Sequence, residues 1–573
     1  MPPSGRTIQA DRAHLRTIGV NAMKTEKAPL SLALAGPVSR RAVLSAAVAV
    51  MGGAVLGPGL VAAPAAAAVI RNHVYTISSR NAFTSTTYPR TEFRALWTAS
   101  VVNIDWPSKS GLSVATQQAE LRSILDLAVS RNLNAVLLQV RPAADRMWKA
   151  TLGEPWSRYL TGTQGKDPGY DPLAYAISEA HKRGIALHAW INPFRVSMDT
   201  SLNSLVASHP ARLNPSWSFA YGPRRYYNPG IPAVRTYIRN VVIDLVKRYD
   251  VDGVHFDDYF YPYPVAGASI PDSSTYNTYK GSFTSISSWR RNNINVFVRD
   301  TRNAIHAAKP RVVFGIGPFG IWANSSSSSL GSATSGLESF YDLYADTRRW
   351  VKEGWVDYIA PQLYWYQGYT PANYNVLVDW WAKQVAGTSV KLYTGEAAYK
   401  VGDPATPAWQ DPNELRDHVT KCRTVPAVRG QAYYNTTAFR ANKLNAIGIL
   451  KAAKYARPGL PVPYTNLLAT RPYTPTITKA VREGTGVRLS WTSSSSGEPI
   501  KLIAIWRWES TGSIVPYIQS TGTYLRTVRR RTAAAQSWLD SGVVLGRYYW
   551  YMIQSISQTG VDSSRATAIF IRA

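Results

Sequence analysis

The fold of this chain is indicated first by one segment, Asp252-Gly253-Val254-His255-Phe256-Asp257-Asp258-Tyr259. A short apolar run leads into two adjacent carboxylates. A run of this length is typical of a buried strand and is too short for a helix. Helical patterns flank it on both sides, over residues 234–248 and 289–309. The segment therefore predicts one strand of a parallel sheet, with Asp257 and Asp258 at its carboxyl end.

Seven further segments repeat this pattern. The eight predicted strands are Arg94–Val102, Ala135–Pro142, Ala186–Phe194, Gly253–Tyr259, Val312–Phe319, Asp357–Trp365, Lys391–Tyr399 and Gly430–Phe439. Helical patterns between them include Gln117–Arg131, Pro172–Arg183, Val234–Arg248, Trp289–Lys309 and Leu337–Glu353. Eight β-then-α units predict an α/β fold of the (β/α)8 TIM-barrel type. An open doubly wound sheet is the alternative, but the Gly-rich turn typical of it is missing after the first strand.

The N-terminal 68 residues have the composition of an export signal. They contain the twin arginine Arg40-Arg41, the moderately apolar run Val43–Leu60 and an alanine tract at 65–68. This order resembles a Tat-type signal peptide. We therefore expect export by the Tat pathway, a mature chain that begins near Val69, and a secreted or cell-wall-associated protein without a stable membrane anchor.

The remaining domain and linker boundaries follow from changes in composition along the chain. Residues 69–91 are predicted to be an N-terminal linker, 92–455 the TIM-barrel domain and 456–469 a Pro-rich linker. Residues 470–573 alternate with period two, as in Ile503–Trp508. This pattern predicts a small all-β sandwich similar to a fibronectin type III domain. A glycan-binding module and a spacer are both compatible with such a domain.

Composition restricts the kinds of partner. The formal net charge is +29, and the chain holds 19 Trp and 34 Tyr. A positive charge of this size favours an anionic partner such as a cell-wall glycan, and no nucleic-acid-binding motif accompanies it. The single cysteine, Cys422, excludes an intramolecular disulfide. No P-loop, HExxH or CxxC pattern is present, so we expect neither a cofactor nor a metal.

Strand phasing indicates which side chains line the barrel mouth, where TIM-barrel chemistry occurs. On the fourth strand Val254 and Phe256 are expected to face the helices, which turns His255 and Asp257 inward. Asp258 is then expected to point away, toward a loop. The same reasoning, with aromatic residues of the mouth loops, predicts substrate contacts for Gln139, Arg141, His188, Trp190, Asn192, His255, Trp322, Gln362, Tyr364 and Trp365. This lining suits a ligand with many hydroxyl groups.

Cleavage of a glycosidic bond fits this lining. It needs one carboxylate that attacks or stabilises the sugar cation and a second group that protonates the leaving oxygen. Asp257 is predicted for the first role, kept ionised by His255 or Arg141. Glu396 on the seventh strand is the first choice for the acid. Asp258 is the second choice, if its strand ends in a bulge, and Glu154 is the third.

Long motifs of the barrel segment resemble glycosyl hydrolase-like family 10 of bacteria. Among them are Asn103-Ile104-Asp105-Trp106-Pro107, His188-Ala189-Trp190-Ile191-Asn192-Pro193-Phe194-Arg195 and Pro361-Gln362-Leu363-Tyr364-Trp365, beside the segment quoted first. The resemblance spans residues 92–455. It implies a TIM-barrel hydrolase of glycans, with peptidoglycan strands lacking stem peptides as the suspected substrate. It also implies that Asp257 is the strand-four nucleophile. Arg195 closes one motif and is added to the predicted substrate contacts.

Three functions compete for this sequence. The first is an exported O-glycosyl hydrolase that cleaves a polysaccharide of the cell wall. The alternative is a non-catalytic glycan-binding protein of the cell wall on a hydrolase fold, because the fifth strand ends in Gly315-Ile316-Gly317-Pro318 without a carboxylate. A polysaccharide deacetylase or esterase is the third. It would need a metal triad or an activated serine, and the sequence offers no pattern for either.

Overall fold

The computed structural model describes residues 74–78, 89–467, 470–493, 498–510, 523–529 and 535–573. Two compact units are distinguished, residues 1–68 and 69–573. The predicted signal peptide lies outside the described residues. Within the described ranges, no helix has both the length and the hydropathy needed to cross a membrane.

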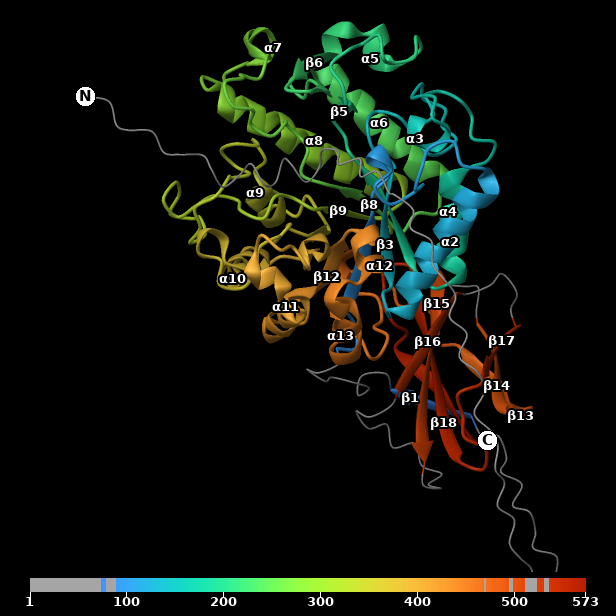
Figure 1. Cartoon of the computed structure of the whole chain (residues 1–573). Coiled ribbons are helices and arrows are strands. Elements are labelled where there is room, and N and C mark those ends of the chain that lie inside the picture. The colour runs from blue at the N-terminus through green and yellow to red at the C-terminus, as the bar shows by residue number, and fades with distance from the viewer. Residues whose placement is uncertain (1–73, 79–88, 468–469, 494–497, 511–522, 530–534) are drawn as a thin grey trace, which may run out of the picture. The chain divides into compact units, whose positions relative to one another are not determined.

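Eight parallel strands close into a barrel, which confirms the predicted fold (Figure 1). They follow one another along the chain and around the barrel, as a TIM barrel requires. Each predicted strand is found, but most are shorter than predicted because the polar carboxyl ends continue as mouth loops. The barrel strands are β2 (Phe93–Thr98), β3 (Ala135–Arg141), β4 (Ala186–Ile191), β8 (Gly253–Phe256), β9 (Val313–Ile316), β10 (Tyr358–Ile359), β11 (Lys391–Ala397) and β12 (Val428–Tyr434).

Helices cover the outside of the strands (Figure 1). Side chains of Ser113, Asp171 and Ser285 accept hydrogen bonds from the first turns of three of them and so define where these begin. The principal helices are α2 (Val114–Ser130), α4 (Pro172–Lys182), α6 (Pro232–Arg248), α8 (Ile286–Ala308), α9 (Thr347–Lys352), α10 (Tyr374–Val385), α11 (Glu414–Thr424) and α13 (Ala446–Ala453).

The prediction of one helix is largely wrong, because most of its residues form a loop. The pattern at 337–353 yields only α9, and residues 337–346 form a loop. Glu338 accepts a hydrogen bond from the backbone N–H of Asn324, and Asp346 caps α9 through the N–H of Arg349. These carboxylates bond loop and cap amides, which competes with helix formation.

Long loops carry additional short elements. A small antiparallel sheet in residues 195–227 has the order β5-β7-β6. The short elements are β5 (Arg195–Ser197), β6 (Ser218–Tyr221), β7 (Arg224–Tyr227), α3 (Arg158–Thr161), α5 (Pro210–Leu213), α7 (Ser273–Tyr279) and α12 (Thr436–Ala441).

The inside of the barrel is aromatic. Phe93, Trp97, Tyr358 and Tyr393 form one cluster there, separate from the larger core between strands and helices. Tyr464 of the predicted linker joins this cluster, and its hydroxyl lies 2.6 Å from that of Tyr393. The barrel is therefore packed inside, and its chemistry is confined to the mouth.

The C-terminal part of the chain is all-β, as predicted. It has a three-stranded sheet, β13-β14-β17, and a five-stranded sheet, β1-β19-β18-β15-β16. Strand β1 comes from the predicted N-terminal linker and pairs with β19, so that segment is partly structured. The likeness to fibronectin type III stays a prediction. The strands are β1 (Val74–Ser78), β13 (Thr476–Glu483), β14 (Gly486–Thr492), β15 (Ile500–Ser510), β16 (Thr523–Arg529), β17 (Ala535–Asp540), β18 (Tyr548–Ser557) and β19 (Arg565–Arg572).

Candidate active site

Asp257 follows directly after β8 and lies at the barrel mouth. Its side chain is 5% exposed. The Asn192 side-chain amide donates to its Oδ2 at 2.7 Å, and the backbone N–H of Tyr259 lies 3.4 Å from its Oδ1. The inward direction predicted for Asp257 therefore agrees with its contacts.

A relay of side-chain amides orients this carboxylate. The Oε1 atom of Gln139 accepts hydrogen bonds from the backbone N–H groups of Ser100 and Val101, at 2.9 and 2.8 Å. Its Nε2 atom must then donate, and it reaches Oδ1 of Asn192 at 2.6 Å. Because Oδ1 of Asn192 accepts that bond, its amide N–H group is the one directed at Asp257. Gln139 and Asn192 thus lie in the site as predicted, and Gln139 acts through Asn192.

Asp258 does not point away from the mouth, in contrast to its predicted direction. It is 5% exposed, and the hydroxyl of Tyr263 donates to its Oδ2. Strand β8 ends at Phe256, so strict alternation no longer applies at residues 257 and 258. Both carboxylates therefore belong to the site. Asp258, the second choice for the general acid, remains a candidate for that role.

The two carboxyl groups are electrostatically coupled. Burial raises the pKa of Asp257, opposed by the charge of Arg195 and by hydrogen bonds from Asn192 and its other neighbours. Burial and then the charge of Asp257 raise the pKa of Asp258 to about 7. Because the charge of Arg195 lowers the pKa of Asp257 while the charge of Asp257 raises that of Asp258, Asp257 ionises first. Asp258 is then the carboxyl group that keeps its proton to higher pH.

Arg195 is the cation of the site. Its Nε donates to the carbonyl of Pro142 at 2.8 Å, and its guanidinium lies 5.1 Å from the centre of the Tyr259 ring. Its charge lowers the pKa of Asp257, and so does the indole N–H of Trp190. Arg195 and Trp190 are thus brought together with Asp257, as predicted.

His255 does not hold Asp257 ionised, which corrects the prediction. The indole N–H of Trp97 donates to its Nε2 at 3.0 Å, so this nitrogen carries no proton. Its Nδ1–H therefore donates to the Tyr358 hydroxyl, also at 3.0 Å. Burial lowers the pKa of His255 well below its ordinary value. The ring is a neutral part of the barrel core.

His188 lies still deeper, and its predicted substrate contact is wrong as well. Its Nδ1 lies 3.0 Å from the Tyr358 hydroxyl, which donates to it after accepting from His255. It pairs in register with Gly253, four residues before Asp257. Burial and the charge of Lys501 lower its pKa to about 3. Both histidines fill the barrel below the mouth.

Arg141 and Glu154 bind each other. The Arg141 guanidinium donates to both Glu154 oxygens, and both side chains are almost fully buried. A register shift beyond Gln139 turns Arg141 away from the site. Its Nη1 donates to the carbonyls of Asn192 and Pro193, at 2.7 and 2.9 Å. The predicted roles of Arg141 as a substrate contact and of Glu154 as an acid are therefore wrong; Arg141 positions the Asn192 backbone.

Glu396 faces the helices and not the mouth. Its Oε1 accepts from the hydroxyls of Tyr374 and Thr394, both at 2.6 Å, and its Oε2 lies 2.8 Å from Nδ1 of His418. Leu392, Thr394 and Glu396 do share one face of β11. That face is the outer one, because Tyr393 joins the inner cluster. The prediction of Glu396 as the general acid is therefore wrong.

Aromatic side chains and an amide complete the mouth. Burial raises the pKa of Tyr364 well above its ordinary value, and the neighbouring Tyr399 and Tyr434 and the charges of Asp258 and Asp257 raise it further. Gln362 donates to the carbonyl of Gly317 at 2.8 Å, and its side chain lowers the pKa of Asp258. The half-buried Trp365 packs edge-on against Phe319, with 5.6 Å between ring centres. These three predicted contacts therefore belong to the mouth.

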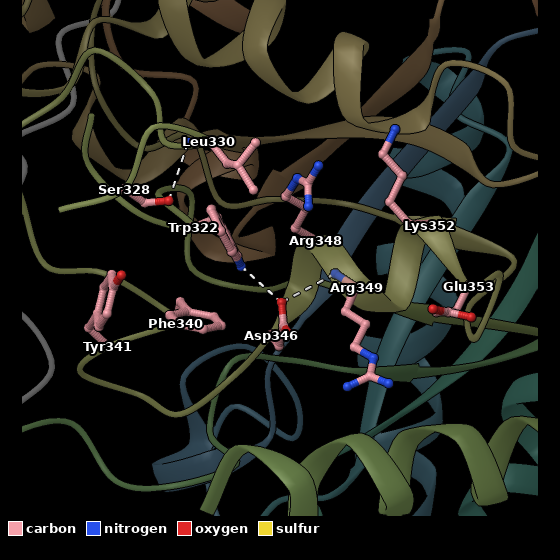
Figure 2. Close-up of a pocket in the computed structure, with 10 residues that line it drawn as sticks. All are labelled: Trp322, Ser328, Leu330, Phe340, Tyr341, Asp346, Arg348, Arg349, Lys352 and Glu353. Carbon is pink, nitrogen blue, oxygen red and sulfur yellow. Dashed lines mark hydrogen bonds between the residues drawn. The ribbon is translucent and has the colours of Figure 1, made fainter. Parts of the chain in front are cut away.

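Trp322 belongs to a different pocket, on the flank of the barrel (Figure 2). Its indole N–H donates to Asp346 at 3.2 Å, and its ring stacks on Trp380. Figure 2 shows aromatic side chains on one side of this pocket, about 500 Å³ in volume, and the cations on the other. None of the pocket residues is a partner of Asp257 or Asp258. The predicted substrate contact of Trp322 at the mouth is therefore wrong.

Two residues of the site were missed in the sequence. Tyr263 donates to Asp258, and Tyr259 supplies an amide to Asp257 and a ring to Arg195. Both follow the carboxylate pair within five residues, so proximity to the strand end was the only available signal. Among the described residues, no group of three or more His, Cys, Asp or Glu side chains is arranged to hold a metal ion.

Comparison with known proteins places this site in a family of hydrolases. The family model described as "Glycosyl hydrolase-like 10" matches residues 92–412. The chain is 43% identical over 478 residues to glycosyl hydrolase YngK of Bacillus subtilis, covering 82% of this chain and 92% of that one. It is 39% identical over 383 residues to glycosyl hydrolase DigH of Escherichia coli, covering 63% and 86%.

Among solved structures, the glycoside hydrolase domain of PgaB (BpsB) from Bordetella bronchiseptica is similar. The identity is 15% and the TM-score 0.42, over 64% of this chain and 99% of that one.

Proposed function

The chain belongs to the glycosyl hydrolase-like 10 family, and from this premise we propose that it is an exported O-glycosyl hydrolase of bacterial cell-wall peptidoglycan strands. One observation carries the proposal of activity. Asp257 is bonded by Asn192 and lies beside the Arg195 charge, while the pKa of its neighbour Asp258 is raised to about 7. A mouth with one ionised and one protonated carboxyl group can perform acid catalysis at neutral pH.

Asp258 is the general acid in this proposal. Its proton passes to the glycosidic oxygen as the C1–O bond breaks, so that the leaving sugar departs as a neutral alcohol. Asp257 stays ionised and stabilises the positive charge that develops at the sugar ring. The Tyr263 hydroxyl then stabilises the Asp258 carboxylate formed by the proton transfer.

Charge and aromatic content support an anionic glycan as the substrate. The net charge of +29 attracts a polyanion. Glycan strands of peptidoglycan carry one carboxylate on each muramic acid, and this carboxylate is free in strands without stem peptides. The Tat-type pattern in residues 1–68 supports export to the compartment where this polymer lies.

The second candidate is a non-catalytic protein that binds cell-wall glycan. It is favoured by the absence of a second carboxylate on the wall opposite Asp257, within the described mouth residues, since Glu396 and Glu154 are both bound elsewhere. In that case Asp257 and Asp258 would only bind sugar hydroxyls.

Product analysis separates the two candidates. The exported protein and its Asp257→Asn variant are incubated with peptidoglycan, intact and amidase-stripped, and the soluble products are identified by mass spectrometry. New saccharide fragments that vanish in the variant support the hydrolase, and a preference for stripped strands supports the substrate. No fragments from either polymer, while both proteins sediment with the wall, would favour the binding protein.

A further inference from the structure

The two carboxylates of the site both follow the end of one strand, β8. Asp257 and Asp258 are consecutive residues, and consecutive Cα atoms are about 3.8 Å apart. A glycosidase that works with two carboxylates alone places them on opposite sides of the bond, about 5–10 Å apart. A pair at the end of one strand can protonate and orient, but it leaves the opposite side of the anomeric carbon without a nucleophile.

Other carboxylates of the barrel loops do not fill this position. Asp105 accepts backbone N–H bonds from Ala99 and Thr437, each at 2.7 Å. Glu154 is bound by Arg141, as described above. Asp105 and Glu154 are thus occupied by structural partners. Asp145 is buried beside Ser157 and Arg158 at the start of α3, and its Oδ1 has no hydrogen-bond partner among the described residues.

We infer that the missing nucleophile is supplied by the substrate, as the 2-acetamido group of the sugar whose glycosidic bond is cleaved. This inference rests on the proposed glycosidase function and narrows its substrates to N-acetylated hexosamines. The group is held at C2, so its carbonyl oxygen reaches C1 within the same ring, and its effective concentration there is high.

The step balances in atoms and electrons. The acetamido oxygen donates a lone pair to C1 while the C1–O bond breaks, and the electron pair of the broken C1–O bond takes the proton of Asp258. An oxazolinium ring forms, and the ionised Asp257 accepts a hydrogen bond from its N–H group and stabilises its positive charge. Water then attacks C1 and gives a proton to the Asp258 carboxylate, while the bond between C1 and the acetamido oxygen breaks and the acetamido group is restored. The net reaction is hydrolysis with retained configuration.

The surroundings of Asp257 suit this role. Its Oδ2 is bonded to Asn192 at 2.7 Å, whereas its Oδ1 has only the backbone N–H of Tyr259, at 3.4 Å, so Oδ1 can accept an N–H bond from a bound sugar. Asn192 is itself fixed by Gln139. A carboxylate held in this way is well placed to orient an amide N–H. The side chains of Tyr364 and Trp190 bring apolar surface near it, which suits the acetamido methyl group.

The inference is tested by binding, independently of turnover. N-acetylglucosamine-thiazoline mimics the cyclic intermediate, and its affinity for the full chain is compared by calorimetry with that of N-acetylglucosamine. We expect the thiazoline to bind about 100-fold more tightly or better. Asp257→Asn should remove most of this preference, whereas the matched variant Asp346→Asn, on the flank pocket, should keep it. Equal affinity for the two sugars would overturn the inference.

Turnover gives the second test. Amidase-stripped glycan strands are chemically de-N-acetylated and then re-N-acetylated, and the cleavage of all three polymers is compared. We expect cleavage to fall by about 100-fold or more on deacetylation and to return on reacetylation. Equal cleavage of all three would overturn substrate assistance and leave the glycosidase function intact. If no polymer is cleaved, the proposed function fails, and the thiazoline affinity alone decides the inference.

Discussion

The side-chain amide of Asn192 donates to Oδ2 of Asp257 at 2.7 Å, and its own oxygen accepts from Gln139 at 2.6 Å. Asp257 is thereby oriented from two strands away, through β3 and β4. The relay ends on the backbone of Ser100 and Val101, just after β2. Residues of three neighbouring strands thus determine the orientation of the Asp257 carboxylate.

Replacing Asn192 by Ala should lower kcat by about 100-fold, because a buried catalytic carboxylate loses the donor that orients it. Gln139→Ala should lower kcat in the same direction but by less, since it acts through Asn192. Both are measured with the glycan strands named above. A change in KM alone, with kcat preserved, would mean that Asn192 binds substrate and does not orient Asp257.

Activity should depend on pH through both carboxyl groups. Asp258 must be protonated to act, and its pKa is raised to about 7, so kcat/KM should fall as pH rises through about 7. Asp257 must be ionised, and its pKa is raised above the ordinary value, so the rate should also fall on the acid side. The profile should therefore be bell-shaped. A rate that stays constant from pH 6 to well above 8 would contradict the assignment of Asp258.

Tyr263→Phe provides a sharper test of the same carboxyl group. The Tyr263 hydroxyl donates to Asp258 and lowers its pKa against the stronger effects of burial and Asp257. Its removal should raise the pKa of Asp258 further and move the alkaline limb of the profile to higher pH. Tyr366→Phe is the control and should leave the limb unchanged, because the Tyr366 ring packs against Tyr369 and the core between strands and helices. A shift to lower pH would contradict the hydrogen-bond direction.

Glu396 should matter for stability and not for chemistry. Glu396→Gln breaks a buried pair with His418 and should lower the free energy of unfolding by about 3–5 kcal/mol. The partners of His418, after the opposing effect of burial, raise its pKa to about 9. The pair therefore stabilises the fold fully below the unfolded pKa of about 6.5 and loses this contribution as pH rises through about 9.

Denaturant unfolding of both proteins at pH 6 and pH 10 measures this difference. It should be large at pH 6 and smaller at pH 10. The folded variant should keep the wild-type kcat. A loss of kcat without a loss of stability would mean that Glu396 takes part in catalysis.

Trp365 and Trp322, two of the predicted substrate contacts, should behave differently when they are replaced. Trp365→Ala should raise KM several-fold, because its half-buried ring lies at the mouth beside Phe319. Trp322→Ala removes a buried ring that stacks on Trp380 and should cost about 3–5 kcal/mol of stability with little effect on KM. Steady-state kinetics and thermal unfolding distinguish the two variants. A raised KM in Trp322→Ala, with an unchanged KM in Trp365→Ala, would contradict the placement of the mouth.

The sequence predicted the barrel well because each strand is a distinct apolar run between helical patterns. It also predicted the inward direction of Gln139 and Trp190, which lie within β3 and β4, and of Asn192 and Asp257, each the first residue after its strand. It failed where alternation ends, as at Asp258 beyond β8 and at Arg141 beyond a register shift.

Two further errors have a different physical cause. Alternation assigns residues to one face of a strand but does not say which face is inside. Glu396 was therefore predicted to point into the barrel, although it lies on the outer face of β11. Alternation also does not show how deep in the barrel a residue lies. His188 and His255 were therefore predicted at the mouth, although both bond Tyr358 below it. Partners distant in sequence, such as Arg141 for Glu154 and His418 for Glu396, could not be paired from spacing.

The central claim is that Asp257 and Asp258 together perform the hydrolysis. It is tested most directly by the rate of fragment release from amidase-stripped glycan strands, measured for the wild type, Asp257→Asn, Asp258→Asn and Glu396→Gln. We predict that each aspartate variant loses nearly all activity while remaining folded, and that Glu396→Gln keeps the wild-type rate per folded molecule. Full activity in either aspartate variant, or selective loss in Glu396→Gln, would contradict the account.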